Sequence, residues 1–205
     1  MARLSNLAAR LGPVKATSPR SSAKIAQSLR AGHPVETWDC VAAAHAILVF
    51  SAAAVERLIA DMAAAEVDWR DRSVILCSAK LDSGALQPLA ERGALSASFA
   101  PIHEDRYIVE GHPAACRAAR DLAGHPRQVV VEIETQSKAR FLDGLEKAAH
   151  AAAAPLTESV TYLRRSGFSA AAAHDLVATV LERRVRTRLR GRDHRVEKRY
   201  TVVER

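Results

Sequence analysis

The sequence predicts an α/β protein, in which a mostly parallel sheet is followed by a smaller all-helical domain. Three apolar runs, too short for buried helices, alternate with two segments of helical periodicity between residues 46 and 101. This alternation is typical of a βαβαβ unit with helices on both faces of a parallel sheet. After Thr135 no strand pattern appears for about fifty residues, because the apolar residues there recur only at helical spacing. We therefore expect a first domain at residues 1–134 and a second at residues 135–205.

The individual elements follow from local patterns. Apolar or β-branched runs predict strands at Val14–Thr17, Val35–Thr37, Ala46–Phe50, Ser73–Cys77, Leu95–Phe99, Arg106–Glu110, Gln128–Ile133 and Tyr200–Val203. Helical stripes predict helices at Ala23–Arg30, 52–65, 84–92, 113–122, 138–152, 156–166 and Ala170–Leu189. Serine before the first of these helices and glycine after it supply an N-cap and a C-cap, and Pro113 suits the first turn of its helix.

Composition limits the classes of function. Aromatic residues make up 4% of the 205 residues, so Val, Leu, Ile and Ala must form the core. No segment has a signal-peptide pattern or could span a bilayer, and we expect a cytoplasmic protein with no membrane partner. The three cysteines are too widely spaced for a metal or redox motif, and five histidines of the chain also lack ligand spacing, so we expect no metal site. These residues are Cys40, Cys77, Cys116, His45, His103, His112, His125 and His150.

The net charge of +7 lies entirely in the C-terminal third. Residues 1–134 carry 15 basic and 15 acidic side chains, and the rest of the chain carries 15 basic and 8 acidic ones. Arginines are densest at Arg183–Arg192. A nucleic-acid or acidic-partner surface is one interpretation, and a solvated helix end favoured by the helix dipole is the other. The second is preferred, because no nucleic-acid-binding motif accompanies the arginines.

Three stretches resemble a known group of proteins. They are Val74–Ser78 with Ser83–Gly93, Tyr107–Ala115, and Ala2–Ala8. Together with the strand–helix order they resemble the oxidoreductases of the 6-phosphogluconate dehydrogenase and pyrroline-carboxylate reductase type. The nearer likeness is to an uncharacterised branch, which joins a Rossmann-like domain to a helical domain of unknown function. The resemblance implies a dinucleotide cofactor and a dimer built by the helical domain.

The departures from this group affect function. A dinucleotide fingerprint needs a strand followed by a glycine-rich turn and a helix, whereas this chain opens with Met1–Ser5. The first, central strand is therefore expected to be missing, through a misassigned start, a sheet closed over the gap, or a degraded fold. The polar positions of the group are also replaced, with Ala100-Pro101 in place of His-Pro and Phe141-Leu142 in place of Tyr-His. Since proton transfer needs a titratable group within reach, we hypothesise weak or lost catalysis.

The remaining candidate site residues lie at predicted strand ends. Ser18, Arg20 and Ser21 follow the strand whose end holds the cofactor ribose in such folds, and Arg with serines suits a 2′-phosphate, so NADP is favoured over NAD. The alternative is an ordinary capped loop with a solvated arginine. Ser51 is a further cofactor candidate, and Ser78 is a weak catalytic one; strand-end capping is the alternative for both.

Lys138 is the second weak catalytic candidate, because it matches the lysine that opens the helical domain in the resembling group. The alternative is a surface lysine at a helix start. The sequence thus predicts an NAD(P)-dependent oxidoreductase-like protein, with a small-molecule substrate of unknown identity and weakened catalysis. It is expected to form a homodimer through its helical domain. The alternative from another class is a non-enzymatic dimerising or nucleic-acid-associated protein that uses the basic C-terminal helix.

Overall fold

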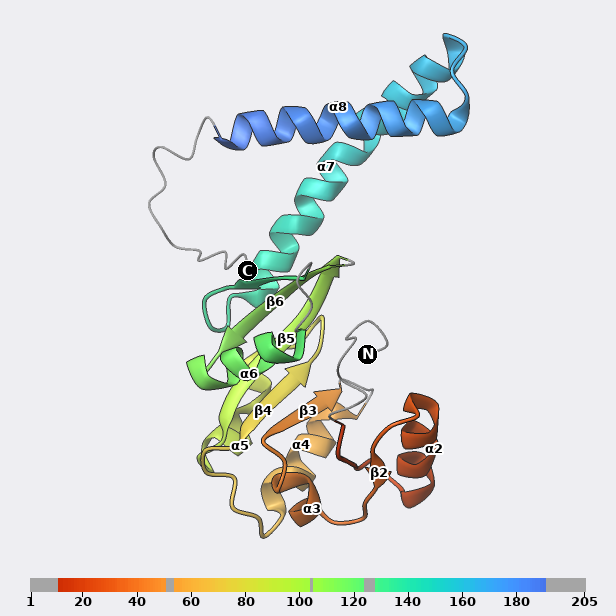
Figure 1. Cartoon of the computed structure of the whole chain (residues 1–205). Helices are drawn as coiled ribbons and strands as arrows, with labels where there is room; N and C mark the ends of the chain where they lie inside the picture. The colour runs from red at the N-terminus through yellow and green to blue at the C-terminus, as the bar shows by residue number, and fades with distance from the viewer. Residues whose placement is uncertain (1–10, 51–53, 104, 124–127, 191–205) are drawn as a thin grey trace. The chain divides into compact units, whose positions relative to one another are not determined.

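The computed structural model describes residues 11–50, 54–103, 105–123 and 128–190 (Figure 1). The strands are β1 (Pro13–Val14), β2 (His33–Pro34), β3 (Ala46–Phe50), β4 (Ser73–Cys77), β5 (Leu95–His103), β6 (Arg106–Gly111) and β7 (Val129–Glu132). The helices are α2 (Pro19–Leu29), α3 (Trp38–Ala42), α4 (Val55–Ala64), η1 (Ser83–Leu86), α5 (Gln87–Ala90), α6 (Pro113–Ala123), α7 (Lys138–Arg165) and α8 (Ala170–Arg190). The described chain divides into two compact units, and the boundary in the sequence lies between Ala139 and Arg140.

The main sheet of the first unit has five strands in the order β3-β4-β5-β6-β7. The first three run parallel, and they are joined by α4 and by η1 with α5. A hairpin then reverses the chain, so that β6 is antiparallel to β5 and parallel to β7. The predicted α/β fold with a mostly parallel sheet is therefore confirmed. The strand expected at Leu95–Phe99 continues to His103, with a register shift between Pro101 and His103.

A second, separate sheet precedes the main one. It consists of β1 and β2, which are parallel and two residues long each. The strand predicted at Val14–Thr17 begins one residue after the start of β1 and is too long. The strand predicted at Val35–Thr37 begins two residues after the start of β2, where β2 has already ended, and is also too long. Within the described residues β1 does not pair with β3, so the alternative in which the sheet has closed over a missing strand is wrong there. The Ala2–Ala8 stretch and the predicted strand at Tyr200–Val203 lie outside the described residues.

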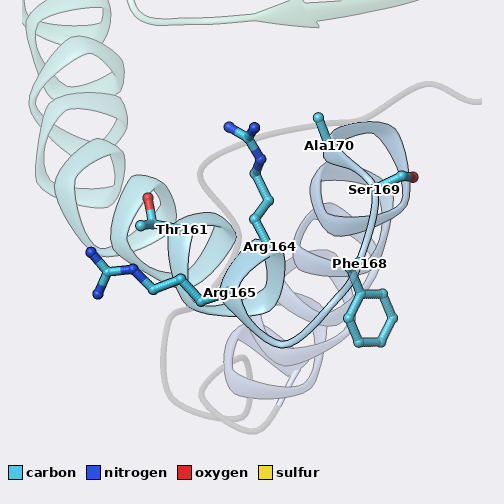
Figure 2. Close-up of a pocket in the computed structure, with 6 residues that line it drawn as sticks. All are labelled: Thr161, Arg164, Arg165, Phe168, Ser169 and Ala170. Carbon is cyan, nitrogen blue, oxygen red and sulfur yellow. The ribbon is translucent and has the colours of Figure 1, made fainter.

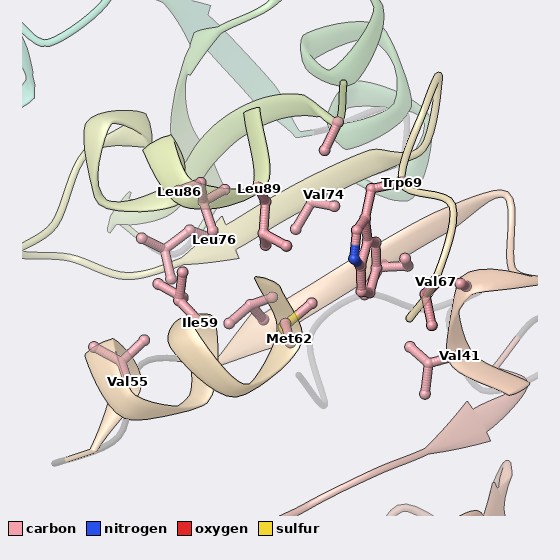
Figure 3. Close-up of a cluster of buried hydrophobic side chains, with 14 residues drawn as sticks. Val41, Val55, Ile59, Met62, Val67, Trp69, Val74, Leu76, Leu86 and Leu89 are labelled. Carbon is pink, nitrogen blue, oxygen red and sulfur yellow. The ribbon is translucent and has the colours of Figure 1, made fainter. Parts of the chain in front are cut away.

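Both faces of the main sheet are covered by apolar side chains. On one face, β3 and β4 pack against α4, η1 and α5, and the buried Trp69 belongs to the same cluster (Figure 3). On the other face, Ala115, Cys116 and Ala119 of α6 pack against β4, β5 and β6. Burying a side chain such as Leu86 or Met62, which are almost wholly inaccessible here, stabilises a fold by about 1.5–3 kcal/mol. The small alanine faces let α6 approach the sheet closely.

The second unit, described up to Arg190, contains the remainder of α7 and α8. Separate helices were predicted on either side of Pro155, but α7 runs through this proline without a break. The hydroxyl groups of Thr157, Ser159 and Thr161, in the turns that follow the proline, donate to carbonyl groups four residues earlier. Gly167 ends the turn to α8 with a positive φ of 95°. No helix among the described residues is long and apolar enough to cross a membrane.

Candidate functional site

The carboxyl end of β4 forms a tight polar turn. The Ser78 hydroxyl accepts the backbone N–H groups of Lys80 and Leu81, at 3.2 and 3.0 Å. Ser78 itself is buried. Its hydroxyl therefore caps the turn after the strand, and this arrangement supports the strand-end capping that was the alternative to a catalytic role.

Lys138 lies directly beneath this turn. It is the first residue of α7, it belongs to the first unit, and its side chain is completely inaccessible to solvent. Its ammonium group donates to the backbone carbonyl of Ser78, to that of Leu81 at 3.1 Å, and to the Ser98 hydroxyl at 2.6 Å. An ammonium group has three N–H donors. All three are therefore matched by protein acceptors, so the surface-lysine interpretation is wrong.

Together with Lys138, Ser78, Ser83 and Ser98, the Glu110 side chain forms a buried polar cluster. It lies opposite Ser98 in the antiparallel pairing of β5 and β6, and it is 1% exposed. Its carboxylate accepts the Ser83 backbone N–H at 2.6 Å, the Ser83 hydroxyl at 2.7 Å and the Gln136 backbone N–H at 3.0 Å. Two of these donors lie at the start of η1 and the third lies just before α7. Glu110 therefore ties both segments to the sheet.

Gly111 allows this arrangement. The backbone φ of Gly111 is +123°, a value that residues other than glycine rarely adopt. A Cβ atom at this position would clash with the Ser96 carbonyl oxygen and with the Ala97 Cα, the latter at 2.8 Å. Glycine thus lets β6 end in close contact with β5, with Glu110 immediately before it on the sheet. The polar cluster depends on this backbone approach.

Burial determines the electrostatics of the cluster. Loss of hydration lowers the pKa of Lys138 from 10.5 to about 8, and the negative charges of Glu110 and Asp82 oppose this change. Burial also raises the pKa of the Cys77 thiol to about 12, although the nearby Lys138 charge opposes it. At neutral pH Lys138 is therefore mainly an ammonium ion, and Cys77 is a thiol that is unsuited to nucleophilic attack.

The chemical consequence is that the hydrogen-bonding groups of Lys138 and Glu110 are already occupied by protein partners. The Lys138 donors and the Glu110 acceptors are directed at protein groups, and both side chains are shielded from water. A general acid must offer its proton to a substrate atom within hydrogen-bond reach. In this arrangement Lys138 instead holds the turn at residues 78–81 and the start of α7 in place.

Ser18, Arg20 and Ser21, which were predicted to bind the ribose phosphate of the cofactor, lie in another part of the first unit, at the N-terminus of α2. Ser18 is the N-cap, and its hydroxyl accepts the Ser21 N–H at 3.2 Å and donates to the Ser21 hydroxyl at 2.9 Å. The buried Ser22 hydroxyl accepts the Ala16 N–H and donates to the Ser18 carbonyl. Arg20 is exposed. Ser51 lies outside the described residues.

The sequence did not single out Glu110, Ser83 or Ser98. A usable signal existed, because Glu110 and Ser98 are polar residues inside otherwise apolar strand patterns, and such residues need partners when buried. The partners of these two residues, however, are 17 to 40 residues away along the chain. Among the described residues, no group of three or more His, Cys, Asp or Glu side chains could hold a metal ion.

A hollow in the second unit lies between the end of α7 and the start of α8 (Figure 2). It is lined by Thr161, Arg164, Arg165, Phe168, Ser169 and Ala170. These six residues are all exposed, and the Ser169 hydroxyl already accepts the Ala172 N–H as an N-cap. The hollow therefore lacks the buried, convergent polar groups that are typical of a ligand site.

Comparison with known proteins supports the fold. No model of a known protein family matches the chain, and no curated protein matches it by sequence. An imine reductase from Streptomyces aurantiacus matches the structure with a TM-score of 0.63 and 14% identity, over 88% of this chain and 69% of that one. Protein TM1727 from Thermotoga maritima matches with a TM-score of 0.55 and 14% identity, over 93% and 75% of the two chains.

A third solved structure is a reductive aminase from Aspergillus terreus in complex with NADPH and ethyl-5-oxohexanoate. It matches with a TM-score of 0.57 and 14% identity, over 90% of this chain and 69% of that one. At these identities the similarity concerns the fold. The predicted likeness in fold to solved oxidoreductases, with a Rossmann-like domain and a helical part, is thereby confirmed.

Proposed function

We propose that this protein is an NADP-binding, oxidoreductase-like protein whose catalysis is weakened or lost. The observation that carries the proposal is the saturation of Lys138, which stands where the resembling group has its lysine. All three of its N–H donors bind protein acceptors in a site closed to solvent. Substrate protonation would require breaking these bonds and exposing the ammonium group, and this raises the barrier to reaction. The substrate would be a small molecule, and the protein would act in the cytoplasm.

The α2 N-terminus supports the choice of cofactor. Three solved structures with a similar fold, including that of the Aspergillus terreus reductive aminase, contain NADPH or NADPH4. Arg20 is exposed beside the N-cap, and unpaired N–H groups at a helix N-terminus favour an anion. A guanidinium group can bind a 2′-phosphate through two parallel hydrogen bonds. Ser18 and Ser21 would then exchange their mutual bond for phosphate contacts, and Ser51 remains a prediction for the same cofactor.

An NADPH titration of the full chain, followed by calorimetry, tests the cofactor. We expect Arg20→Ala to weaken NADPH binding by about tenfold or more, since a charge-assisted bond contributes roughly 1.5–3 kcal/mol. Lys24→Ala is the matched control, because it removes one exposed positive charge from the same helix. It should leave the affinity unchanged. Absence of binding at millimolar NADPH would end the proposal, and equal affinity for NADH would end the NADP assignment.

Homodimerisation through the helical part is a second proposal. Among residues 140–183 only Ala173 is buried, while large apolar side chains are exposed along both helices and in the turn between them. These side chains are Leu145, Tyr162, Phe168, Leu176, Val180 and Leu181. Long helices gain most of their stability from packing an apolar face, so two helices with this little burial need a cover. A second copy of the same chain presents an equivalent face.

Light scattering of the purified protein tests the dimer. We expect twice the chain mass for the parent protein and a monomer for Val180→Glu, because a carboxylate would enter the apolar face. Glu158→Gln, at an exposed position of α7, is the control and should stay dimeric. A monomeric parent protein would refute the proposal. The nucleic-acid alternative requires retention on heparin that disappears after truncation at Gly191.

A further inference from the structure

We infer that Lys15 is a positioning residue for the proposed NADP site and acts through the indole ring of Trp38. The inference rests on the proposed function, because it concerns how the turn that carries Arg20 is held in place. Lys15 directly follows β1, and Trp38 is the first residue of α3. The Lys15 ammonium group lies over the Trp38 ring, 4.8 Å from its centroid. This separation is within the limit of about 6 Å for attraction between a cation and an aromatic face.

Trp38 is anchored in the core of the first unit. Its side chain and that of Val35 are partly buried and pack against the buried cluster that contains Ile47 and Val49. The backbone N–H of Val35 donates to the Val14 carbonyl at 3.0 Å, which joins this anchor to β1. The β1–β2 ribbon is two residues long per strand, and a ribbon of that size is not stable by itself. It therefore depends on contacts of this kind for its position.

The connection continues from Lys15 to the turn that is proposed to bind the phosphate. Ala16, the next residue, donates its backbone N–H to the Ser22 hydroxyl at 2.8 Å. Both the hydroxyl and the backbone N–H of Ser22 donate to the Ser18 carbonyl. Ser18 is the N-cap of α2, and Arg20 lies in the first turn of that helix. A series of contacts thus connects the core to the turn that presents Arg20.

Lys15 and Arg20 serve the cofactor in different ways. Arg20 is exposed, whereas Lys15 is partly buried and its ammonium group lies over the indole ring. Direct binding of a phosphate by Lys15 would require the ammonium group to leave that ring. A turn that is already held in its binding conformation loses less entropy when the ligand binds. Lys15 therefore raises the affinity for the cofactor without contacting it.

Hydrogen exchange of the full chain without cofactor tests the positioning. We expect Lys15→Met to speed the exchange of the Ala16 and Val35 amides by about two- to fivefold, the range that a partly exposed cation–π contact contributes. Lys15→Arg should leave both rates unchanged, since a guanidinium group also stacks on an aromatic face. Lys24→Met is the control, because it removes an exposed lysine of α2, and it should change neither rate. Unchanged exchange in Lys15→Met would overturn the inference.

NADPH calorimetry on the same variants relates the contact to the cofactor. Lys15→Met and Trp38→Leu should each weaken NADPH binding by about two- to fivefold. The double variant should lose no more affinity than either single variant, because both changes remove the same contact. Trp38→Leu keeps the Lys15 charge. Full affinity in Trp38→Leu, together with weaker binding in Lys15→Met, would therefore show a direct phosphate contact and overturn the inference.

The outcomes separate this inference from the cofactor proposal. Absence of NADPH binding by the parent protein would end the cofactor proposal, and the positioning role of Lys15 would end with it. Normal NADPH binding by the parent protein and by both single variants would overturn this inference alone. Should Trp38→Leu fail to fold, the comparison of Lys15→Met with Lys15→Arg still decides, since equal affinity in these two variants would contradict a role for the cation over the ring.

Discussion

Lys138→Met should change how the stability of the protein depends on pH. Burial lowers the pKa of Lys138 to about 8 in the folded chain, against 10.5 in the unfolded chain. Between these two values the unfolded state binds more protons than the folded state, so the free energy of unfolding rises with pH. Below pH 8 both states are protonated, and this group adds no slope.

The magnitude follows from the size of the shift. One pKa unit corresponds to about 1.4 kcal/mol, and the shift from 10.5 to about 8 therefore gives roughly 3 kcal/mol across the whole interval. This value already includes the hydrogen bond that a neutral amine would lose, because a pKa shift reports every difference in interaction between the two protonation states. Between pH 7 and pH 10, slightly short of the whole interval, the expected rise is about 2.5 kcal/mol.

Urea unfolding at pH 7, 8, 9 and 10 measures this effect as a difference between variants. The stability of the parent protein relative to Lys138→Met should rise as the pH increases. Lys147→Met is the control, because Lys147 is an exposed lysine of the same helix that pairs with Asp143. Its difference from the parent protein should stay flat over this interval. A flat or falling difference for Lys138→Met would refute the assignment of a buried, charged Lys138.

Three further predictions concern the surroundings of the cluster. Glu110→Gln should lower the free energy of unfolding by about 1–3 kcal/mol, because its amide nitrogen faces donors, while the exposed Glu146→Gln should be neutral in the same urea assay. Gly111→Ala should destabilise by more than about 2 kcal/mol, whereas Gly144→Ala, in open space within α7, should stabilise by about 0.5–1 kcal/mol; thermal unfolding compares them, and equal effects would contradict the close approach of β5 and β6. Arg92→Met should cost about 1–2 kcal/mol, since Arg92 donates to the carbonyl of Ala63 in the last turn of α4 and to those of Ala65 and Val67 after it, and unchanged stability would show that these bonds contribute nothing.

The parallel core could be predicted because its signals are local. The apolar runs at Ala46–Phe50 and Ser73–Cys77 appear in the structure with the same bounds, and each is short, uninterrupted and followed by a helical stripe. The two strands before them were misplaced. β1 and β2 are two residues long each, and their positions depend on pairing with each other rather than on a run of β-forming residues.

The polar cluster could not be predicted in the same way. Lys138 was recognised by resemblance, but its burial depends on the Ser98 hydroxyl, forty residues earlier, and on two carbonyl groups that have no side-chain signature. Glu110 reaches its partners because β6 returns antiparallel along β5. Helical periodicity likewise could not show that α7 continues through Pro155, because a proline inside a helical pattern normally ends or kinks the helix at the preceding residue.

Single-turnover absorbance at 340 nm tests the account most directly. The full chain is saturated with NADPH and mixed with cyclohexanone and allyl amine, the pair found with one of the solved reductive aminases. We expect NADPH to bind and its absorbance to stay constant over minutes, because the Lys138 donors are held by the protein. Oxidation of the bound NADPH at about 1 s⁻¹ or faster, a rate typical of working enzymes, would contradict the claim that catalysis is weakened or lost.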